Sequence, residues 1–194
     1  MKYLALLLLS LLVFATGCGD DDDEDVRLLD AELNYAGPQF LAPNLGQGSH
    51  EYAAYFPGNF TSQFQGRVLE AIEFDLVAVP QSVEVIVYES GRFNDEPGSV
   101  IYRRNISSQV TGTGVQRHVV AEPIEITGNG LWLAIAVEHA GNTTQSVGCD
   151  DGSQYNVNGD RLRSERTDQR WTTFREVTNG AETVNFNIRG YLAE

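Results

Sequence analysis

PIEITGNGLWLAIAVE, residues 123–138, is the stretch that decides the fold. Asn129-Gly130 lies between two apolar runs, which is typical of a β-hairpin because both residues tolerate positive φ angles. The second run, Leu131–Glu138, has no polar face over most of its length, so we expect a strand in the middle of a covered sheet. Strand alternation places its side chains on two faces: Leu131, Leu133, Ile135 and Val137 on one, and Trp132, Ala134 and Ala136 on the other.

Short apolar segments separated by turn residues continue on both sides of this stretch. No segment after residue 18 shows the spacing of apolar residues that an amphipathic helix requires. About nine or ten short strands therefore predict an all-β fold, a two-sheet antiparallel sandwich over residues 26–194. Besides the hairpin, the expected strands are Glu51–Phe56, Arg67–Val79, Ser82–Glu89, Val100–Ile106, Gln116–Val120, Trp171–Phe174 and Val184–Tyr191.

Two of these expectations concern the end of the chain. In the last strand, Phe186 should face inward while Asn185 and Asn187 face solvent, because polar and apolar residues alternate there. Residues 142–168 are polar and rich in Gly and Asn, and we expect an irregular connection in this region.

Length and charge restrict the class of protein. The chain has 194 residues and a formal net charge of −14, which is enough length for one domain with a substantial core. Without the six acids of residues 20–25 and without Lys2, 21 acidic side chains remain against 12 basic ones, a formal charge of −9. Nucleic-acid binding requires a basic surface, so we expect no nucleic-acid partner.

The N-terminus carries an apolar run, Leu4–Phe14, that is shorter than the ~20 residues needed to span a bilayer as a helix. The run has the length of the apolar part of a signal peptide. The sequence Val-Phe-Ala-Thr-Gly-Cys ending at Cys18 resembles the lipobox of bacterial lipoproteins. The resemblance implies a signal peptide over residues 1–17 and a membrane anchor of several acyl chains on Cys18. An ordinary cleaved signal, with Cys18 incidental, is the alternative.

Residues 18–25 contain the predicted anchor Cys18, then Gly19, then six consecutive acidic residues, Asp20–Asp25. Like charges without apolar residues do not fold, so this segment is interpreted as a solvated tether. Alternatively, it resembles the surface-export signal of some Bacteroidetes lipoproteins. If Cys18 is lipidated, Cys149 has no cysteine partner, and we expect a small buried thiol there.

Four segments occur in an order that resembles a known family. They are EYAAYF with GRVLEAIEFDL, VEVIVYESGRFNDEPGSVIYRRNI, PIEITGNGLWLAIAVE with VGCDDG, and RWTTF with NFNIRGYL. Together they resemble the jelly-roll domains of Bacteroidetes-type surface and secreted proteins, similar to the cleaved-adhesin group. The resemblance covers Glu51–Leu192 and implies a jelly-roll sandwich. It also implies a non-catalytic, adhesin-like module that binds glycans or proteins, with structural calcium in some members.

Calcium is the cofactor that the sequence raises. Asp150, Asp151 and Asp160 lie in one polar loop with Asn156 and Asn158, and calcium takes six to eight oxygen ligands of these kinds. The family resemblance carries Asp150 over as a calcium ligand, although Cys149 stands where the motif differs. A solvated loop built from turn-forming residues is the alternative, and in that case there is no cofactor.

Enzymatic function receives little support from the sequence. Glu73 and Asp75 resemble part of the Glu-x-Asp-x-x-Glu motif of laminarinase-like sandwiches, but Ala78 occupies the position of the third acid. Glycoside hydrolysis needs two correctly placed carboxylates, so we expect no enzyme and keep a glycoside hydrolase as the third candidate.

A carbohydrate-binding face is the strongest functional candidate. Trp132 beside Ala134 and Ala136 would form an aromatic platform in a shallow groove, which suits a sugar or an extended peptide. The alternative is that another segment covers Trp132. The sequence thus predicts a lipid-anchored lipoprotein of the bacterial outer membrane or cell surface that binds a glycan or a surface protein. The competing prediction is an accessory envelope lipoprotein with no small-molecule ligand.

Overall fold

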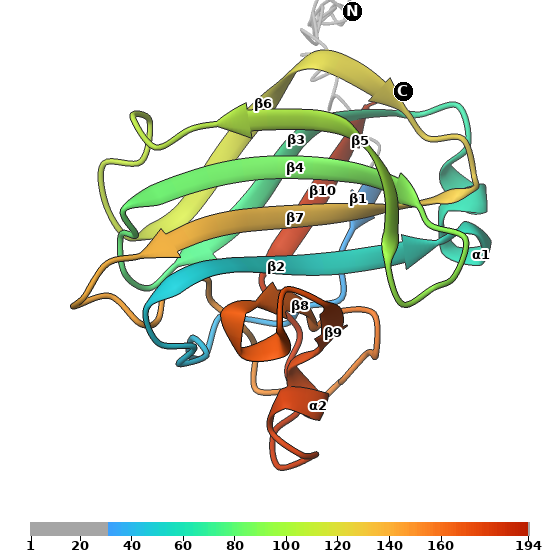
Figure 1. Cartoon of the computed structure of the whole chain (residues 1–194). Helices are drawn as coiled ribbons and strands as arrows, with labels where there is room; N and C mark the ends of the chain where they lie inside the picture. The colour runs from blue at the N-terminus through green and yellow to red at the C-terminus, as the bar shows by residue number, and fades with distance from the viewer. Residues whose placement is uncertain (1–30, 194) are drawn as a thin grey trace, which may run out of the picture.

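Strand β7 (Gly130–His139) lies near the middle of the larger of two antiparallel sheets, between β2 and β4 (Figure 1). The computed structural model describes residues 31–193. The six-stranded sheet has the order β5-β4-β7-β2-β8-β9. Its other strands are β2 (Gly48–Pro57), β4 (Ser82–Ser90), β5 (Pro97–Asn105), β8 (Arg161–Ser164) and β9 (Trp171–Thr173). The predicted central position of Leu131–Glu138 is therefore confirmed.

The second sheet has four strands in the order β1-β10-β3-β6 and packs against the first. Its strands are β1 (Ala31–Leu33), β3 (Val68–Leu76), β6 (Gly114–Glu125) and β10 (Ile188–Ala193). The chain changes sheet after β1, β2, β3, β5, β6 and β9, as in a jelly roll. The prediction of an all-β, two-sheet antiparallel sandwich with nine or ten strands is confirmed.

The remaining regular elements are single turns. They are α1 (Gly58–Thr61), η1 (Ser62–Phe64), η2 (Glu165–Thr167) and α2 (Phe174–Val177). Within residues 31–193, none of the helices is long and apolar enough to cross a membrane.

The predicted hairpin at Asn129-Gly130 is wrong. The strand before the turn, β6, pairs with β3 in the four-stranded sheet, whereas β7 pairs with β2 and β4 in the other sheet. The turn therefore carries the chain across the sandwich, with φ angles of 78° at Gly128 and 89° at Gly130. The two strands differ in burial: β6 is exposed over most of its length and lies at the edge of its sheet, whereas β7 is buried on both faces and lies inside its sheet.

The core lies between the two sheets. Alternate residues of β7 fill it, namely Leu131, Leu133, Ile135 and Val137, all at most 5% exposed. Gly190 on β10 lets the two sheets approach, because a Cβ placed there would lie 2.8 Å from Leu133 Cδ1 and 2.9 Å from Leu69 Cδ1. The facing leucines therefore use the space that a side chain at residue 190 would need.

Two sequence-based expectations for the C-terminal part need correction. The irregular connection over residues 142–168 contains strand β8, which extends the sheet beyond β2. Asn185 and Asn187 are fully buried, although their alternation with Phe186 predicted exposure. Asn185 is satisfied by Asp150, and Asn187 Nδ2 donates to the Gly37 carbonyl at 2.9 Å. Loops therefore cover both asparagines, which strand periodicity does not reveal.

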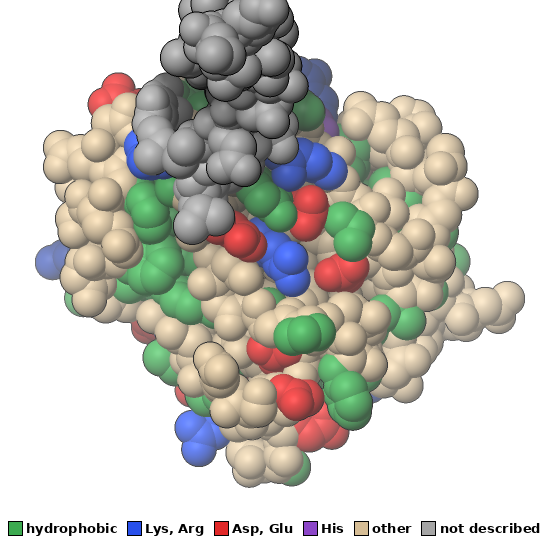
Figure 2. Space-filling model, turned by 180° about the vertical axis from the view of Figure 1, so that it is seen from behind, with side chains coloured by type: hydrophobic (Ala, Val, Ile, Leu, Met, Phe, Trp, Pro, Cys, Tyr) green, Lys and Arg blue, Asp and Glu red, His purple; other side chains and the backbone are tan. Residues whose placement is uncertain are grey.

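The outer face of the four-stranded sheet is a mixed surface. Figure 2 shows this side of the molecule, where acidic and basic side chains lie next to one another among apolar ones. Glu73 lies between Arg117, 3.6 Å away, and Arg189, 3.9 Å away, and it accepts a hydrogen bond from the Tyr191 hydroxyl at 3.1 Å. This network leaves no uncompensated carboxylate at Glu73.

Candidate functional site

The outer face of the six-stranded sheet carries the other faces of β7 and its neighbours. Ala136 of β7 is paired in register with Glu84 of β4 on one side and with Glu51 of β2 on the other. All three side chains point away from the core because the inward residues of these strands are their sequence neighbours. A small residue thus separates two carboxylate-bearing strands.

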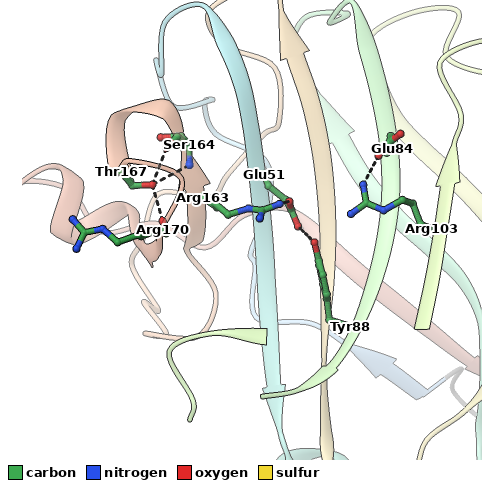
Figure 3. A network of polar contacts seen from close by, with 8 residues as sticks. All are labelled: Glu51, Glu84, Tyr88, Arg103, Arg163, Ser164, Thr167 and Arg170. Carbon is green, nitrogen blue, oxygen red and sulfur yellow. Dashed lines mark hydrogen bonds and ion pairs between the residues drawn. The ribbon is translucent and has the colours of Figure 1, made fainter. Parts of the chain in front are cut away.

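Glu51 is held from two sides. Its carboxylate accepts a hydrogen bond from the Tyr88 hydroxyl at 2.5 Å and pairs with the Arg163 guanidinium at 2.5 Å. Figure 3 shows Tyr88 and Arg163 approaching Glu51 from opposite sides: Arg163 from the adjacent strand β8, and Tyr88 from β4, across β7. Glu51 is only 4% exposed, whereas the Arg163 side chain is 35% exposed. The arginine therefore presents the network to solvent, and the buried glutamate orients it.

Glu84 forms the corresponding pair on the other side of β7. Its carboxylate lies 2.6 Å from the guanidinium of Arg103 on β5, and both side chains are partly exposed (Figure 3). Five neighbouring strands thus present Arg103, Glu84, Ala136, Glu51 and Arg163 in spatial order across the sheet. The result is a pair of carboxylate–guanidinium walls on either side of an alanine.

A groove of about 240 Å³ lies between these walls. It is small compared with sites for drug-sized ligands, which occupy roughly 300–1,000 Å³. Polar side chains dominate the lining, which contains no Phe, Tyr or Trp. The lining residues are Ser49, His50, Glu51, Ser82, Glu84, Arg103, Ala136, Val137, Glu138, Arg163 and Gln169.

The loop after β8 closes one end of the groove. Asp168 and Gln169 are consecutive non-glycine residues with positive φ angles of 51° and 59°. Such a backbone costs roughly 1 kcal/mol or more per residue and persists only where its surroundings impose it. Here Thr167 Oγ1 lies 3.0 Å from the Ser164 amide and 2.6 Å from the Arg170 carbonyl (Figure 3). These contacts of Thr167 fix the loop, which places the exposed Gln169 beside the groove.

Trp132 is not an open platform, which corrects the sequence-based expectation. Its ring is fully buried and stacks on Tyr55 with 4.9 Å between ring centroids. The Trp171 ring lies 5.2 Å away, and the Arg161 guanidinium lies 5.5 Å from the Trp132 ring centre. Arg161 belongs to β8 and Trp171 to β9, so the strands that cover Trp132 include the one that the sequence did not predict.

The other two predicted binding residues have different positions. Ala134 is fully buried, between Ile86 and Ala53 of the neighbouring strands. Ala136 is half-buried and lines the groove, so it is the member of the predicted set that a ligand can reach. Sequence reasoning missed the walls of the groove. Strand alternation could have placed Glu51 and Glu84 on the outer face, but Arg163 depends on the unpredicted β8.

The three predicted calcium ligands do not converge. Asp150 accepts four hydrogen bonds, from the amides of Gly37, Gly152 and Asn185 and from the Asn185 side chain, at 2.6–3.0 Å. A carboxylate offers about four lone-pair sites, and all four are occupied here. Asp151 is exposed and accepts from a backbone amide.

Asp160 belongs to a different hydrogen-bond network. It accepts from the Arg175 amide at 3.0 Å and the Tyr155 hydroxyl at 3.4 Å, and burial raises its pKa to about 6. Within residues 31–193, no group of three or more His, Cys, Asp or Glu is placed to hold a metal. Asp150, Asp151 and Asp160 thus have separate hydrogen-bond partners in this structure, and calcium binding by them stays a prediction.

Two buried histidines, His50 of β2 and His139 of β7, follow Ser49 and Glu138 in sequence and lie on the opposite face of the sheet. The rings of His50 and His139 lie 4.6 Å apart, and both contact the Gly46 carbonyl, through His50 Nε2 at 3.1 Å and His139 Nδ1 at 2.9 Å. His139 Nε2 lies 2.7 Å from Ser146 Oγ. Burial lowers the pKa of both imidazoles, and the neighbouring His139 further lowers the pKa of His50. The pair is therefore neutral in the folded protein near pH 7.

Two further predicted features have different outcomes. Cys149 is a buried free thiol whose pKa is raised by burial to about 12, as expected for an inert cysteine. Cys18 and the acidic run of residues 20–25 lie outside the described residues, so lipidation stays a prediction.

Comparison with known proteins shows the fold. No family model matches the sequence, and no curated protein does. Among solved structures, the chain is similar to the cysteine protease and lectin-like domains of Cwp84, a surface-layer associated protein of Clostridium difficile. The TM-score is 0.50 at 13% identity over 75% of this chain, and the match spans 32% of that chain. This chain thus has a β-sandwich similar to part of that structure.

Proposed function

We propose that the groove above Ala136 binds a hydroxyl-rich glycan without catalysing a reaction. The observation that carries this proposal is the pair of carboxylate–guanidinium walls, Glu51–Arg163 and Glu84–Arg103, on either side of the alanine. A sugar hydroxyl donates one hydrogen bond and accepts others, so adjacent hydroxyls match a carboxylate that accepts beside a guanidinium that donates. Charge-assisted hydrogen bonds of this kind are the stronger ones.

The side chains of one wall are already ordered before a ligand arrives. Glu51 is buried and has a partner at each carboxylate oxygen, and its ion pair orients Arg163. Binding orders few new rotamers as a result, and each rotamer-rich side chain that is fixed in advance saves about 0.5–1.5 kcal/mol. This preorganisation supports recognition.

The same ion pairs favour binding over hydrolysis. An inverting glycosidase uses one carboxylic acid as a proton donor and a second carboxylate as a base. Glu51 and Glu84 each have a guanidinium within 2.6 Å. Both carboxylates are therefore engaged in ion pairs, which suits holding hydroxyls better than the separate acid and base roles. Glu73, on which the hydrolase candidate depends, lines none of five well-formed cavities within residues 31–193.

The proposed location is the bacterial cell surface, with the module tethered by acyl chains on Cys18. Support comes from the lipobox-like sequence, the acidic run and the resemblance to surface proteins. The similar solved structure is itself from a surface-layer associated protein. An accessory envelope lipoprotein with no sugar ligand is the competing proposal.

A glycan array probed with the purified full chain tests the binding function. Ala136→Leu fills the floor of the groove without removing a hydrogen bond, and we expect it to abolish binding to the glycans that the parent protein retains. Ala121→Leu makes the same change at an exposed position of β6, outside the groove, and should leave binding intact. Equal binding by both variants, or silence of the parent protein on the array, contradicts the proposal.

The anchor has its own test. Cys18→Ser should move the protein from the membrane fraction to the soluble fraction, whereas Cys149→Ser changes a buried thiol and should leave it in the membrane. Membrane retention of Cys18→Ser counts against lipidation.

A further inference from the structure

The charges in the groove are unequal in number. Three carboxylates line it, those of Glu51, Glu84 and Glu138, against two guanidiniums, those of Arg103 and Arg163. Each guanidinium is already paired with a carboxylate, Arg103 with Glu84 and Arg163 with Glu51. Among residues 31–193, Glu138 has no arginine within 4 Å, and it accepts a hydrogen bond from the Ser49 hydroxyl. The groove therefore carries one uncompensated negative charge.

That charge is at one defined end. Glu138 follows Ala136 by two residues on β7, so its side chain lies on the same face about 7 Å further along the strand. Its neighbours in the sheet are Ser49 of β2 and Ser82 of β4. Both are small hydroxyl residues, and Glu138 itself is only half-buried. A ligand resting on Ala136 can therefore reach the Glu138 carboxylate.

The negative net charge of the whole protein adds to the negative electrostatic potential at the groove. The formal net charge of the whole chain is −14, and the sequence pI is about 4.5. A field of this sign raises the concentration of cations near the surface and opposes the approach of anions. The two arginines do not offset this for a ligand, because each is engaged by a carboxylate at 2.5–2.6 Å.

We propose that the groove selects sugars that carry a free ammonium group over neutral sugars, and neutral sugars over acidic ones. The inference rests on the proposed function and names the class of glycan: an amino sugar that is not acetylated. Its hydroxyls meet the two carboxylate–guanidinium walls while its ammonium meets Glu138, Ser49 and Ser82. An ammonium has three donors and no acceptor, which matches one carboxylate flanked by two hydroxyl oxygens.

Calorimetry or fluorescence titration with four matched probes tests this order. The probes are oligomers of equal length of glucosamine, N-acetylglucosamine, glucose and glucuronic acid, added to the full chain at low salt. A half-exposed ion pair contributes about 0.2–1 kcal/mol, so we expect glucosamine to bind up to about fivefold more tightly than the acetylated and neutral oligomers. The glucuronic acid oligomer should bind most weakly. Salt at about 0.5 M should reduce the differences in affinity between the four oligomers, because salt screens the interaction between exposed charges.

Two variants separate a local contact from the overall charge. Glu138→Gln and Glu182→Gln change the net charge equally, but Glu182 is exposed and does not line this groove. The ratio of glucosamine to glucose affinity should fall to about one in Glu138→Gln and stay at the parent value in Glu182→Gln. An equal fall in both variants, or no fall in Glu138→Gln, overturns the inference.

Other outcomes distinguish this inference from the proposed function. If all neutral and amino sugars bind equally, the selectivity is wrong while glycan binding stands. If no sugar binds, the proposed function fails with it. If lysine amide binds as tightly as glucosamine, Glu138 captures any ammonium, and the assignment to amino sugars is overturned.

Discussion

Glu51 and Glu84 lie on opposite sides of β7, each paired in register with Ala136. Because neighbouring strands are about 4.8 Å apart, the backbones that carry the two carboxylates are about 10 Å apart. The backbone ladder, rather than any loop, therefore sets the separation of the two walls. The width of the groove therefore depends on the sheet itself. Substitutions that disturb the side-chain pairs of this sheet should also disturb the groove.

Tyr88→Phe should weaken the wall at Glu51. It removes the hydroxyl that donates to a carboxylate that is only 4% exposed, and hydrogen bonds to charged groups contribute about 1.5–3 kcal/mol. We expect a loss of that order in the free energy of unfolding, measured by urea denaturation. Tyr191→Phe removes a similar hydroxyl–glutamate bond, to Glu73, at a more exposed position and should cost less. A larger loss for Tyr191→Phe would contradict the burial argument.

Trp132→Ala should destabilise the fold before it affects recognition. The ring is fully buried against Tyr55 and Trp171, and truncation of a buried Trp costs about 3–5 kcal/mol. Val119→Ala, at a residue that is 68% exposed, should change the free energy of unfolding by less than about 0.5 kcal/mol. Chemical denaturation of both variants checks the difference. A fully stable Trp132→Ala protein would mean that the ring is not packed as described.

The sequence predicted the sandwich because strand periodicity is local. The alternation of Leu131 to Val137 with Trp132 to Ala136 is correct at each position, and so is the central place of the strand. The partner of that strand was wrong, because a Gly-Asn-Gly turn serves equally for a hairpin and for a crossing between sheets. β6 joins the four-stranded sheet because it pairs with β3. The local sequence does not reveal this pairing.

The candidate site was less predictable than the fold. Ala136 does line a groove, so its role in binding stays a prediction, but Trp132 is not the expected open platform because β8 and β9 cover it. Arg161 and Arg163 belong to a four-residue strand within a polar, glycine-rich region. Its apolar pattern consists of one buried leucine, Leu162, which is too short a signal for a strand.

Gly190→Ala should destabilise the contact between the sheets. The new Cβ would lie 2.8 Å from Leu133 Cδ1 and 2.9 Å from Leu69 Cδ1, and overpacking of a core typically costs about 1–3 kcal/mol. Gly112→Ala is the matched control, because nothing lies within 4 Å of a Cβ at that position. Thermal denaturation should show a lower midpoint for Gly190→Ala than for Gly112→Ala. Equal midpoints would show that the leucines rearrange without cost.

Stability should fall as the pH drops below the ordinary histidine pKa of about 6.5. His50 and His139 have folded-state pKa values below their unfolded values, so between the two values the unfolded chain binds more protons. Their stabilising contribution is complete above about pH 6.5 and is lost as pH falls towards the folded-state pKa values. Denaturation midpoints measured from pH 7.5 to 5 follow this loss.

Asp160 acts in the opposite direction over the same range. Its pKa is raised to about 6 in the folded protein, so the folded state gains its proton first as pH falls and is stabilised relative to the unfolded state. Asp160→Asn should therefore steepen the acid loss of stability. His50→Gln, which keeps a donor for the Gly46 carbonyl, should flatten it. If both variants follow the parent curve, these groups do not control the pH response.

The pairing of β7 with its two neighbours also links recognition to folding. A slip of either neighbour by a single residue would turn its carboxylate into the leucine layer and its apolar side chains out to water. Such a slip is so unfavourable that the packing of the core also fixes the spacing of the groups that line the groove. Evolution can therefore exchange the residues on the exposed side one by one, changing what is bound while the scaffold that sets their distances stays constant.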